Sequence, residues 1–227
     1  MHGRTLSWGH IRDNESKIDW LRESTLTWEK NIGTISKTVR KCPQESYGAV
    51  LGVIQLEWIF IQRVTWYTGG AFAGVEKIIQ KILLPRLFFG NTKTLSPIVG
   101  ALGTMPIKLS GLGLLNPVIS ANYNCQFSQW GSVELIRAVT GGGAFYNTNH
   151  LRALGEEICD RQKYRGVENE TKIKGLVQDL KVTDRRLILR SNLTGAWMSV
   201  YSTTVSGAVF PATEFCDFLY ARYNVSP

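Results

Sequence analysis

The chain has 227 residues, of which 44% are apolar, enough to build a sizeable core in one large domain or two small ones. Its formal net charge is +8, and residues 58–137 carry seven lysines and arginines against two glutamates. Such an excess favours a polyanionic partner, and the alternative is a basic face that serves only solubility.

The cysteines and the first residues exclude several classes of protein. The four cysteines lie far apart, with no C-x-x-C pair and no histidine at zinc-ligand spacing, which predicts free thiols in a reducing compartment. The N-terminal sequence lacks the apolar run of a signal peptide, and no stretch approaches the roughly 18 apolar residues of a membrane-spanning helix. We therefore expect a soluble intracellular protein, nuclear or cytoplasmic.

The first predicted elements are a short strand or turn over residues 4–11 and a long helix after it. Asp13 or Asn14 is the expected N-cap of this helix, and Pro43 marks the break that follows it. The apolar stripe of the helix consists of Ile18, Leu21, Trp28, Ile32, Ile35 and Val39.

The longest apolar run, residues 50–64, lies inside a central helix predicted over residues 44–66. Fifteen residues exceed the usual length of a strand, and the apolar positions follow helical spacing. One stripe consists of Leu51, Ile54, Trp58 and Ile61, and a second of Val50, Val53, Leu56 and Phe60. We expect a helix buried on most of its circumference. Four polar residues set into the run either satisfy hydrogen bonds in the core or face a ligand; they are Gln55, Glu57, Gln62 and Arg63.

Prolines and glycines mark the predicted boundaries of the elements in the next part of the chain. A third helix over residues 72–82 is expected to stop at Pro85, and the many glycines and prolines of residues 86–115 predict a loop with short extended pieces. Asn116-Pro117 is typical of a helix start, and this helix is expected to run to Thr140 with a candidate break near Ser128.

The last third of the chain predicts peripheral helices and a small mixed segment. Two charged, exposed helices are expected around residues 151–158 and 173–180, followed by a short helix over residues 183–190. Residues 197–200 and 205–210 are typical of strands around a turn, and residues 211–223 of a helix. The predicted fold class is mainly α, with a small C-terminal α/β piece.

The sequence contains no visible catalytic site. Two-metal chemistry requires clustered carboxylates, and no two aspartates are adjacent or spaced as D-x-D. The dense acidic group at Glu156, Glu157 and Asp160 reads as a salt-bridged helix surface. Ser110–Leu114 is a G-x-G without the third glycine of a dinucleotide site. An enzyme whose site is invisible in the sequence is one alternative.

Aromatic, basic and amide side chains interleave at the end of the central helix. Arginine and lysine neutralise phosphates, amides bond sugars or base edges, and aromatic rings stack on bases. Buried tryptophan more often belongs to the core, and a buried glutamine often satisfies a neighbouring backbone. We assign Trp58 to the core, leave both roles open for Gln62, and predict Arg63 and Lys108 as phosphate contacts.

Several short motifs occur in a characteristic order along the chain. They are Pro43-Gln44 with Tyr47, Leu56-Glu57-Trp58 with Gln62-Arg63-Val64, Leu84-Pro85 with Leu87, Ser110–Leu114 with Asn116-Pro117, Thr194–Met198, Glu214-Phe215 with Asp217, and Arg222-Tyr223. With these motifs the chain resembles reverse transcriptases of non-LTR-like retrotransposons, over nearly its whole length. The similarity is to the region downstream of their catalytic palm.

The resemblance implies a division of the chain and a set of binding residues. Residues 1–12 correspond to a remnant of the palm and its primer-grip strand, residues 13–117 to a helical thumb-like region, residues 118–190 to a helical downstream region, and residues 191–227 to a small α/β segment. Leu6, Gly9 and Ile11 are similar to the primer-grip pattern, with Ser7-Trp8 where a glycine is expected. The nucleic-acid-binding residues implied for the thumb are Gln62, Arg63, Lys108, Gly111 and Gly113.

The resemblance also implies what this fragment lacks. The catalytic aspartates and their Mg²⁺ belong to the palm, which would precede residue 1. We therefore expect no polymerase activity, no catalytic residue, and neither metal nor cofactor in this chain. The implied partners are the backbone of an RNA–DNA or DNA duplex and the palm of the parent polypeptide, with no membrane. The main alternative is a helical scaffold or protein-interaction module with no nucleic-acid role.

Overall fold

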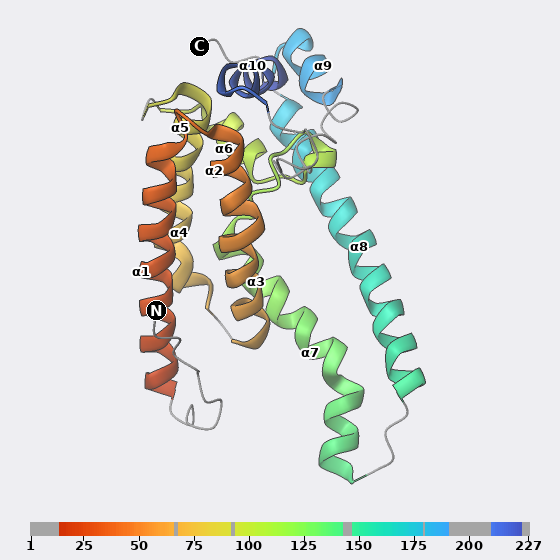
Figure 1. The fold of residues 1–227 in the computed structure, drawn as a ribbon. Helices are drawn as coiled ribbons and strands as arrows, with labels where there is room; N and C mark the ends of the chain where they lie inside the picture. The colour runs from red at the N-terminus through yellow and green to blue at the C-terminus, as the bar shows by residue number, and fades with distance from the viewer. Residues whose placement is uncertain are drawn as a thin grey trace.

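The computed structural model describes residues 14–65, 68–91, 94–142, 147–178, 180–190 and 210–223. Within these ranges the chain is helical and contains no strand, which confirms the mainly α class (Figure 1). The strands predicted for residues 4–11, 197–200 and 205–210 lie outside the described residues, apart from Phe210, which is not in a strand.

The first helix, α1 (Asn14–Thr38), packs lengthwise on α4 (Ala73–Ile78). Trp28 of the predicted stripe is buried and stacks on Phe72, with ring centroids 5.9 Å apart. Its indole N–H donates to Glu57 at 2.8 Å, which joins α1 to the central helix. Ile18 is exposed, contrary to its place in the predicted stripe, because the first turns of α1 project beyond the helices it packs against (Figure 1).

The central helix is continuous through α2 (Pro43–Ala49), a π-helical turn at Val50–Ile54 and α3 (Gln55–Val64). The stripe with Ile54 and Trp58 is buried, as predicted. In the second stripe Val50 is buried, but Val53, Leu56 and Phe60 are more than half exposed. The expectation that most of the circumference is buried is therefore wrong, because α1 and α7 (Pro117–Gly141) pack against only part of the helix.

The prediction that Pro85 ends the third helix is also wrong. The helix passes from α4 through a π-helical turn at Ile79–Leu83 into α5 (Leu84–Phe89). Proline in a regular α-helix lacks one N–H and clashes with the carbonyl four residues earlier. The wider π-helical turn precedes Pro85 and relieves this clash. The helix ends at Gly90, whose φ of +65° closes it in the left-handed conformation.

The segment predicted as a loop contains a short helix, α6 (Pro97–Gly103). The Ser96 hydroxyl accepts a hydrogen bond from the amide of Val99 at 3.3 Å, and Pro97 occupies the first turn. A 3₁₀ turn at Ile107–Leu109 follows, and the chain then runs without regular structure to Asn116. The sequence did not predict α6, because its glycines, like those of the surrounding segment, are typical of a loop.

The part of this loop at residues 110–114 lies largely in the core, since Ser110, Leu112 and Leu114 are fully buried. Side chains from three helices form hydrogen bonds with the backbone of the loop, and one hydroxyl of the loop donates to the backbone of α9. The bonds are Tyr47 Oη to Leu112 O, Gln55 Nε2 to Gly113 O (3.1 Å), Leu115 N to Gln55 Oε1 (2.8 Å), Arg222 Nη2 to Ile107 O (2.9 Å) and Gly111 O (3.3 Å), and Ser110 Oγ to Ile188 O. The buried loop is therefore the point at which α2, α3, α9 (Val182–Arg190) and α10 (Ala212–Tyr223) meet.

Two long helices, α7 and α8 (Asn147–Gln178), extend from the upper body as an arm (Figure 1). Asn116 caps α7 by accepting from the amide of Ile119 at 2.9 Å, as predicted, and α7 has no break at Ser128. α8 is a single helix where two were predicted, with i,i+3 and i,i+4 ion pairs such as Lys172–Glu168 at 3.3 Å along it.

One hydrophobic core holds the described helices together. It extends from Leu21 in α1 to Tyr223 in α10, so the regions predicted as residues 13–117 and 118–190 share it. None of the described helices is long and apolar enough to cross a membrane.

Gly111→Ala tests the buried loop. A Cβ at this position would lie 1.8 Å from the carbonyl oxygen of Met105, a backbone atom that cannot move away alone. We expect the free energy of unfolding, measured by urea denaturation, to fall by at least about 2 kcal/mol. Gly141→Ala is the matched control, since its Cβ meets nothing within 4 Å, and it should change stability by less than about 1 kcal/mol. Equal stabilities for the two variants would contradict the loop packing.

Candidate nucleic-acid interface

Gln62 belongs to the core, which decides the role that the sequence left open. It is fully buried, and its amide N–H donates to Pro117 O at 2.8 Å. Its carbonyl oxygen accepts from Ser120 Oγ at 2.9 Å and from Asn124 Nδ2 at 2.8 Å. The prediction of Gln62 as a nucleic-acid contact is corrected accordingly, because its polar atoms bond α7 to α3.

Gly111 and Gly113 are also structural positions rather than surface contacts. Gly111 is buried and leaves no space for a Cβ. Gly113 has a φ of +71°, which favours glycine, and its amide donates to Met105 O at 2.8 Å. Their predicted contact with nucleic acid is corrected, since their backbones are engaged inside the protein. Leu6, Gly9 and Ile11 lie outside the described residues.

Arg63, by contrast, is exposed at the C-terminal end of α3. Among the described residues it forms no hydrogen bond or ion pair, and it lies at the edge of a cleft between α7 and α8. Its guanidinium is therefore available to an anionic partner.

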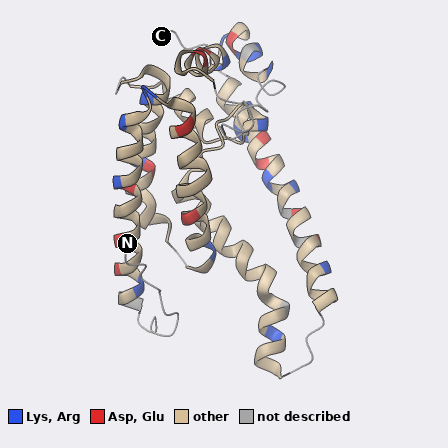
Figure 2. Cartoon of the chain, viewed as in Figure 1, with Lys and Arg blue, Asp and Glu red and all other residues tan. Residues whose placement is uncertain are grey.

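Lys108 is the second exposed cation predicted from the sequence. It lies in the 3₁₀ turn at Ile107–Leu109, two residues before Ser110, which bonds α9. Other exposed cations on α8, on α9 and just before α9 extend the charge at this end of the molecule (Figure 2); they are Lys174, Lys181, Arg186 and Arg190. Arg185 of α9 instead donates to Val177 O at 3.0 Å and caps α8.

Arg63 and Lys108 lie beside different parts of the central helix. Ile107 and Leu51 both approach the Cβ position of Gly113, at 3.3 and 3.8 Å, which places the Lys108 turn beside the middle of the helix. Arg63 lies in the last turn of the helix, twelve residues after Leu51, or about 18 Å along the axis at 1.5 Å per residue. Lys108 does not line the cleft beside Arg63, so the two cations are separate contacts on the surface.

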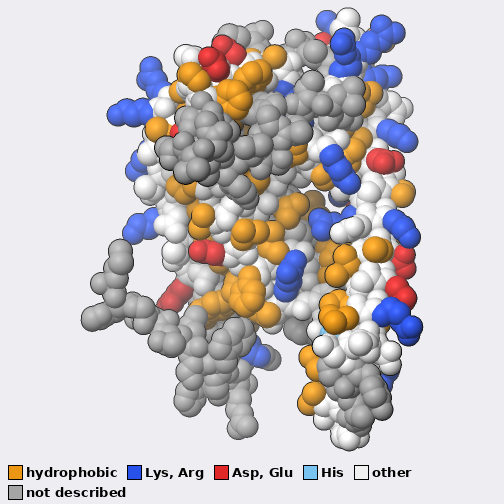
Figure 3. All heavy atoms as spheres, turned by 45° about the vertical axis from the view of Figure 1, so that its right-hand side comes forward, with side chains coloured by type: hydrophobic (Ala, Val, Ile, Leu, Met, Phe, Trp, Pro, Cys, Tyr) orange, Lys and Arg blue, Asp and Glu red, His pale blue; other side chains and the backbone are white. Residues whose placement is uncertain are grey.

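The cleft beside Arg63 has a volume of about 540 Å³. We call it the α7–α8 cleft, and it is lined by Arg63, Asn124, Phe127, Ser128, Gly131, Ser132, His150, Leu154, Ile158, Gln162 and Arg165. Arg165 lies over the ring of Phe127, 5.9 Å from its centroid. On the face shown in Figure 3, hydrophobic and basic side chains lie next to one another between the body and the α7–α8 arm.

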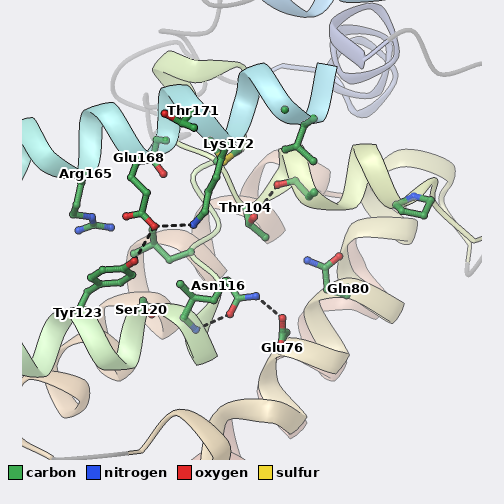
Figure 4. A pocket seen from close by; sticks show the side chains of 18 residues that line it. Glu76, Gln80, Thr104, Asn116, Ser120, Tyr123, Arg165, Glu168, Thr171 and Lys172 are labelled. Atoms are coloured by element: carbon green, nitrogen blue, oxygen red, sulfur yellow. Dashed lines mark hydrogen bonds and ion pairs between the residues drawn. The ribbon is translucent and has the colours of Figure 1, made fainter. Parts of the chain in front are cut away.

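A second pocket, of about 700 Å³, adjoins this cleft through Arg165 and is lined by α4, α6, α7 and α8 (Figure 4). Tyr123 donates to Glu168 at 2.8 Å, and Lys172 pairs with the same carboxylate at 3.3 Å. The hydrogen bond from Tyr123 lowers the pKa of Glu168 below its ordinary value, and the charge of Lys172 adds to this effect. Two glutamates balance two cations in its lining, so this pocket does not select an anion.

Sequence reasoning missed Arg165 and His150, because only the packing of α8 beside α7 brings them near Arg63. Within the described ranges no group of three or more His, Cys, Asp or Glu side chains is placed to hold a metal ion. Comparison of the chain with protein-family models, curated proteins and solved structures finds no match. The functional interpretation therefore depends on the ordered motifs and on the exposed cations.

Gln62→Leu tests the buried amide network. The substitution leaves Pro117 O, Ser120 and Asn124 without their partner in the core, so we expect a loss of about 1–3 kcal/mol in the free energy of unfolding. Gln126→Leu, on the exposed side of α7, is the control and should cost less than about 0.5 kcal/mol. Equal denaturation midpoints would show that Gln62 is not bonded as described.

Tyr123→Phe tests the bond to Glu168 through its pH dependence. A carboxylate with a lowered pKa stabilises the fold above its ordinary pKa, and this stabilisation is lost as pH falls through the lowered value. Without the tyrosine hydroxyl, the pKa of Glu168 should rise towards 4.5 in a carboxyl NMR titration, and the variant should lose stability at pH 7 but not at acid pH. Tyr164→Phe removes an exposed hydroxyl as control; an unchanged Glu168 pKa in Tyr123→Phe would refute the assignment.

Proposed function

We propose that this chain is a non-catalytic, thumb-like part of a retroelement reverse transcriptase and holds the template–primer duplex by its backbone. Two things support the proposal: the order of the motifs in the sequence, and a mainly helical fold like that expected of a thumb. The observation that carries it is that Arg63 and Lys108, the two cations predicted as phosphate contacts, are both exposed and lie beside different parts of the central helix.

In this proposal the cations act by neutralising phosphates. Each contact releases counterions from the duplex and fixes its position without reading its sequence. Binding without sequence preference has dissociation constants of about 10⁻⁴–10⁻⁶ M at physiological salt, so the isolated chain should bind in this range. The palm of the parent enzyme would supply the carboxylates, the Mg²⁺ and the chemistry.

A protein-interaction module is the second candidate function, and one specific observation favours it. Val53, Leu56, Phe60 and Val64 form an exposed apolar stripe on the central helix. Contiguous exposed apolar surface of this kind often marks a contact with another protein. A chain that acted only as a scaffold would use this stripe and would not need Arg63 or Lys108.

Arg63→Glu and Lys108→Glu test the nucleic-acid proposal. Each reverses an exposed charge that has no partner among the described residues, so the fold should remain and duplex affinity should fall. We expect the dissociation constant for an RNA–DNA primer–template, measured by fluorescence anisotropy at 50 mM salt, to be at least tenfold higher than that of the unmodified chain. Circular dichroism should be unchanged.

Lys30→Glu is the matched control, an equal change of net charge at an exposed site on α1. If all three variants weaken binding equally, the chain attracts the duplex only through its net charge, and the assignment of Arg63 and Lys108 is lost. Loss of the helical circular dichroism signal in Arg63→Glu would show that this arginine stabilises the fold and is not simply an exposed phosphate contact.

A further inference from the structure

The α7–α8 cleft presents two helix faces with an open position between them. On α8 the lining residues His150, Leu154, Ile158 and Gln162 follow one another at four-residue intervals, which places them on one face. On α7 the opposite wall includes Ser128, Gly131 and Ser132, again on one face. Leu154 fills the space beside Gly131, where a Cβ would lie 2.8 Å from its Cδ1, so the two walls touch at this level. The room for side chains of a third helix is beside the other lining residues, which include Ser128, Ser132 and Ile158.

The charges of the cleft have one sign. Arg63 on α3 and Arg165 on α8 line it, and its described lining contains no aspartate or glutamate. Glu168, which lines the adjoining pocket, interacts electrostatically with Arg165 and offsets part of its charge, so Arg63 is the cation without a nearby carboxylate in either lining. Ile158 is nearly half exposed, so the lining combines apolar and basic side chains.

We propose that the α7–α8 cleft binds an acidic amphipathic helix of another protein. Its apolar stripe packs on Leu154 and Ile158, and its aspartates or glutamates pair with Arg63 and Arg165. From His150 to Arg165 the α8 wall is fifteen residues long, about 22 Å, which matches four turns of a partner helix. This binding mode is that of an amphipathic helix in a groove, with anchors at i, i+3 or i+4, and i+7.

Charge complementarity excludes the chain itself as the occupant. Outside the described ranges the sequence contains only two acidic residues, Asp13 and Asp179, which lie in different segments, so no such segment supplies an acidic face. A second copy carries the same net charge of +8 and is repelled.

A nucleic-acid strand fits the cleft less well than a peptide. Stacking of bases requires an open aromatic face, and the guanidinium of Arg165 lies over the ring of Phe127. Apart from His150, the remaining lining side chains are aliphatic, small or amides and offer no further face for stacking. The cleft proposal shares Arg63 with the proposed duplex binding, so the variants that test it lie at Arg165 and Gln162, outside the duplex contacts.

Two labelled synthetic helices test the proposal on the full chain. One has about sixteen residues, with leucines at i, i+3, i+7, i+10 and i+14 and glutamates elsewhere on its flanks; the other carries lysines in place of the glutamates. In fluorescence anisotropy at 50 mM salt, the acidic helix should bind at least tenfold more tightly than the basic one. Equal affinities, or no binding of the acidic helix, would overturn the proposal.

Variants place the peptide in the cleft. Arg165→Gln should weaken binding of the acidic helix at least fivefold, while Lys163→Gln, on the exposed side of the same helix, should leave it unchanged. Gln162→Trp keeps every charge but fills the cleft from an exposed position, and it should also weaken binding. If these variants instead weaken binding of a single-stranded oligonucleotide and leave the acidic helix unaffected, the cleft is a nucleic-acid site and the proposal is wrong.

Discussion

The fold depends on satisfying the backbone of a loop, residues 110–116, that has no regular secondary structure although much of it lies in the core. Leu112 and Leu114 bring this loop inside, where an unbonded amide or carbonyl costs free energy. Tyr47, Gln55 and Arg222 supply the missing partners from helices far apart in the sequence. The same bonds fix where α2, α3 and α10 meet.

The position of each exposed cation follows from this arrangement. Because Gln55 bonds the loop, Lys108 is held near the middle of the central helix. Because Gln62 bonds Pro117, Ser120 and Asn124, α7 crosses the C-terminal end of the helix, and Arg63 lies beside the α7–α8 cleft. Buried amides thus determine where surface charge appears.

The polar residues inside the longest apolar run resolve into two classes. Gln55 and Gln62 bond the buried loop and α7, and Glu57 accepts from Trp28 of α1. Arg63 alone among the four is exposed without a hydrogen bond or ion pair to any described residue. A sequence cannot separate these classes, because each partner lies on another element whose position depends on the tertiary fold.

Local signals in the sequence predicted much of the fold. Pro43 and Asn116 begin helices as expected, because capping and proline geometry act within a few residues. The prediction that Pro85 ends a helix is wrong because a π-helical turn accommodates the proline. This turn depends on tertiary packing, which the residues near Pro85 do not reveal. The predicted burial of Phe60 is wrong for a similar reason, since its exposure depends on which face of the central helix α1 and α7 cover.

For the candidate site, the sequence predicted Arg63 and Lys108 as phosphate contacts, and both are exposed. It also gave Gln62, Gly111 and Gly113 a contact with nucleic acid, which is contradicted by the burial of Gln62 and Gly111 and by the internal hydrogen bonds of the Gly113 backbone. A glycine in such a motif can allow either a ligand or another part of the backbone to approach closely. At Gly111 the approaching group is Met105 O, which only the structure shows. Arg165 could not be assigned from spacing, because it is about one hundred residues from Arg63 in the chain.

The salt dependence of duplex binding by the unmodified chain tests the functional proposal most directly. A chain that neutralises phosphates releases counterions, so the logarithm of its affinity for an RNA–DNA primer–template should fall linearly with the logarithm of salt concentration between about 50 and 200 mM, with a slope of about −0.9 for each phosphate contact. A slope of about −1.8 or steeper is the result expected from contacts that include both Arg63 and Lys108. Absence of binding at 50 mM salt, or an affinity independent of salt, would contradict the proposal and favour the protein-interaction module.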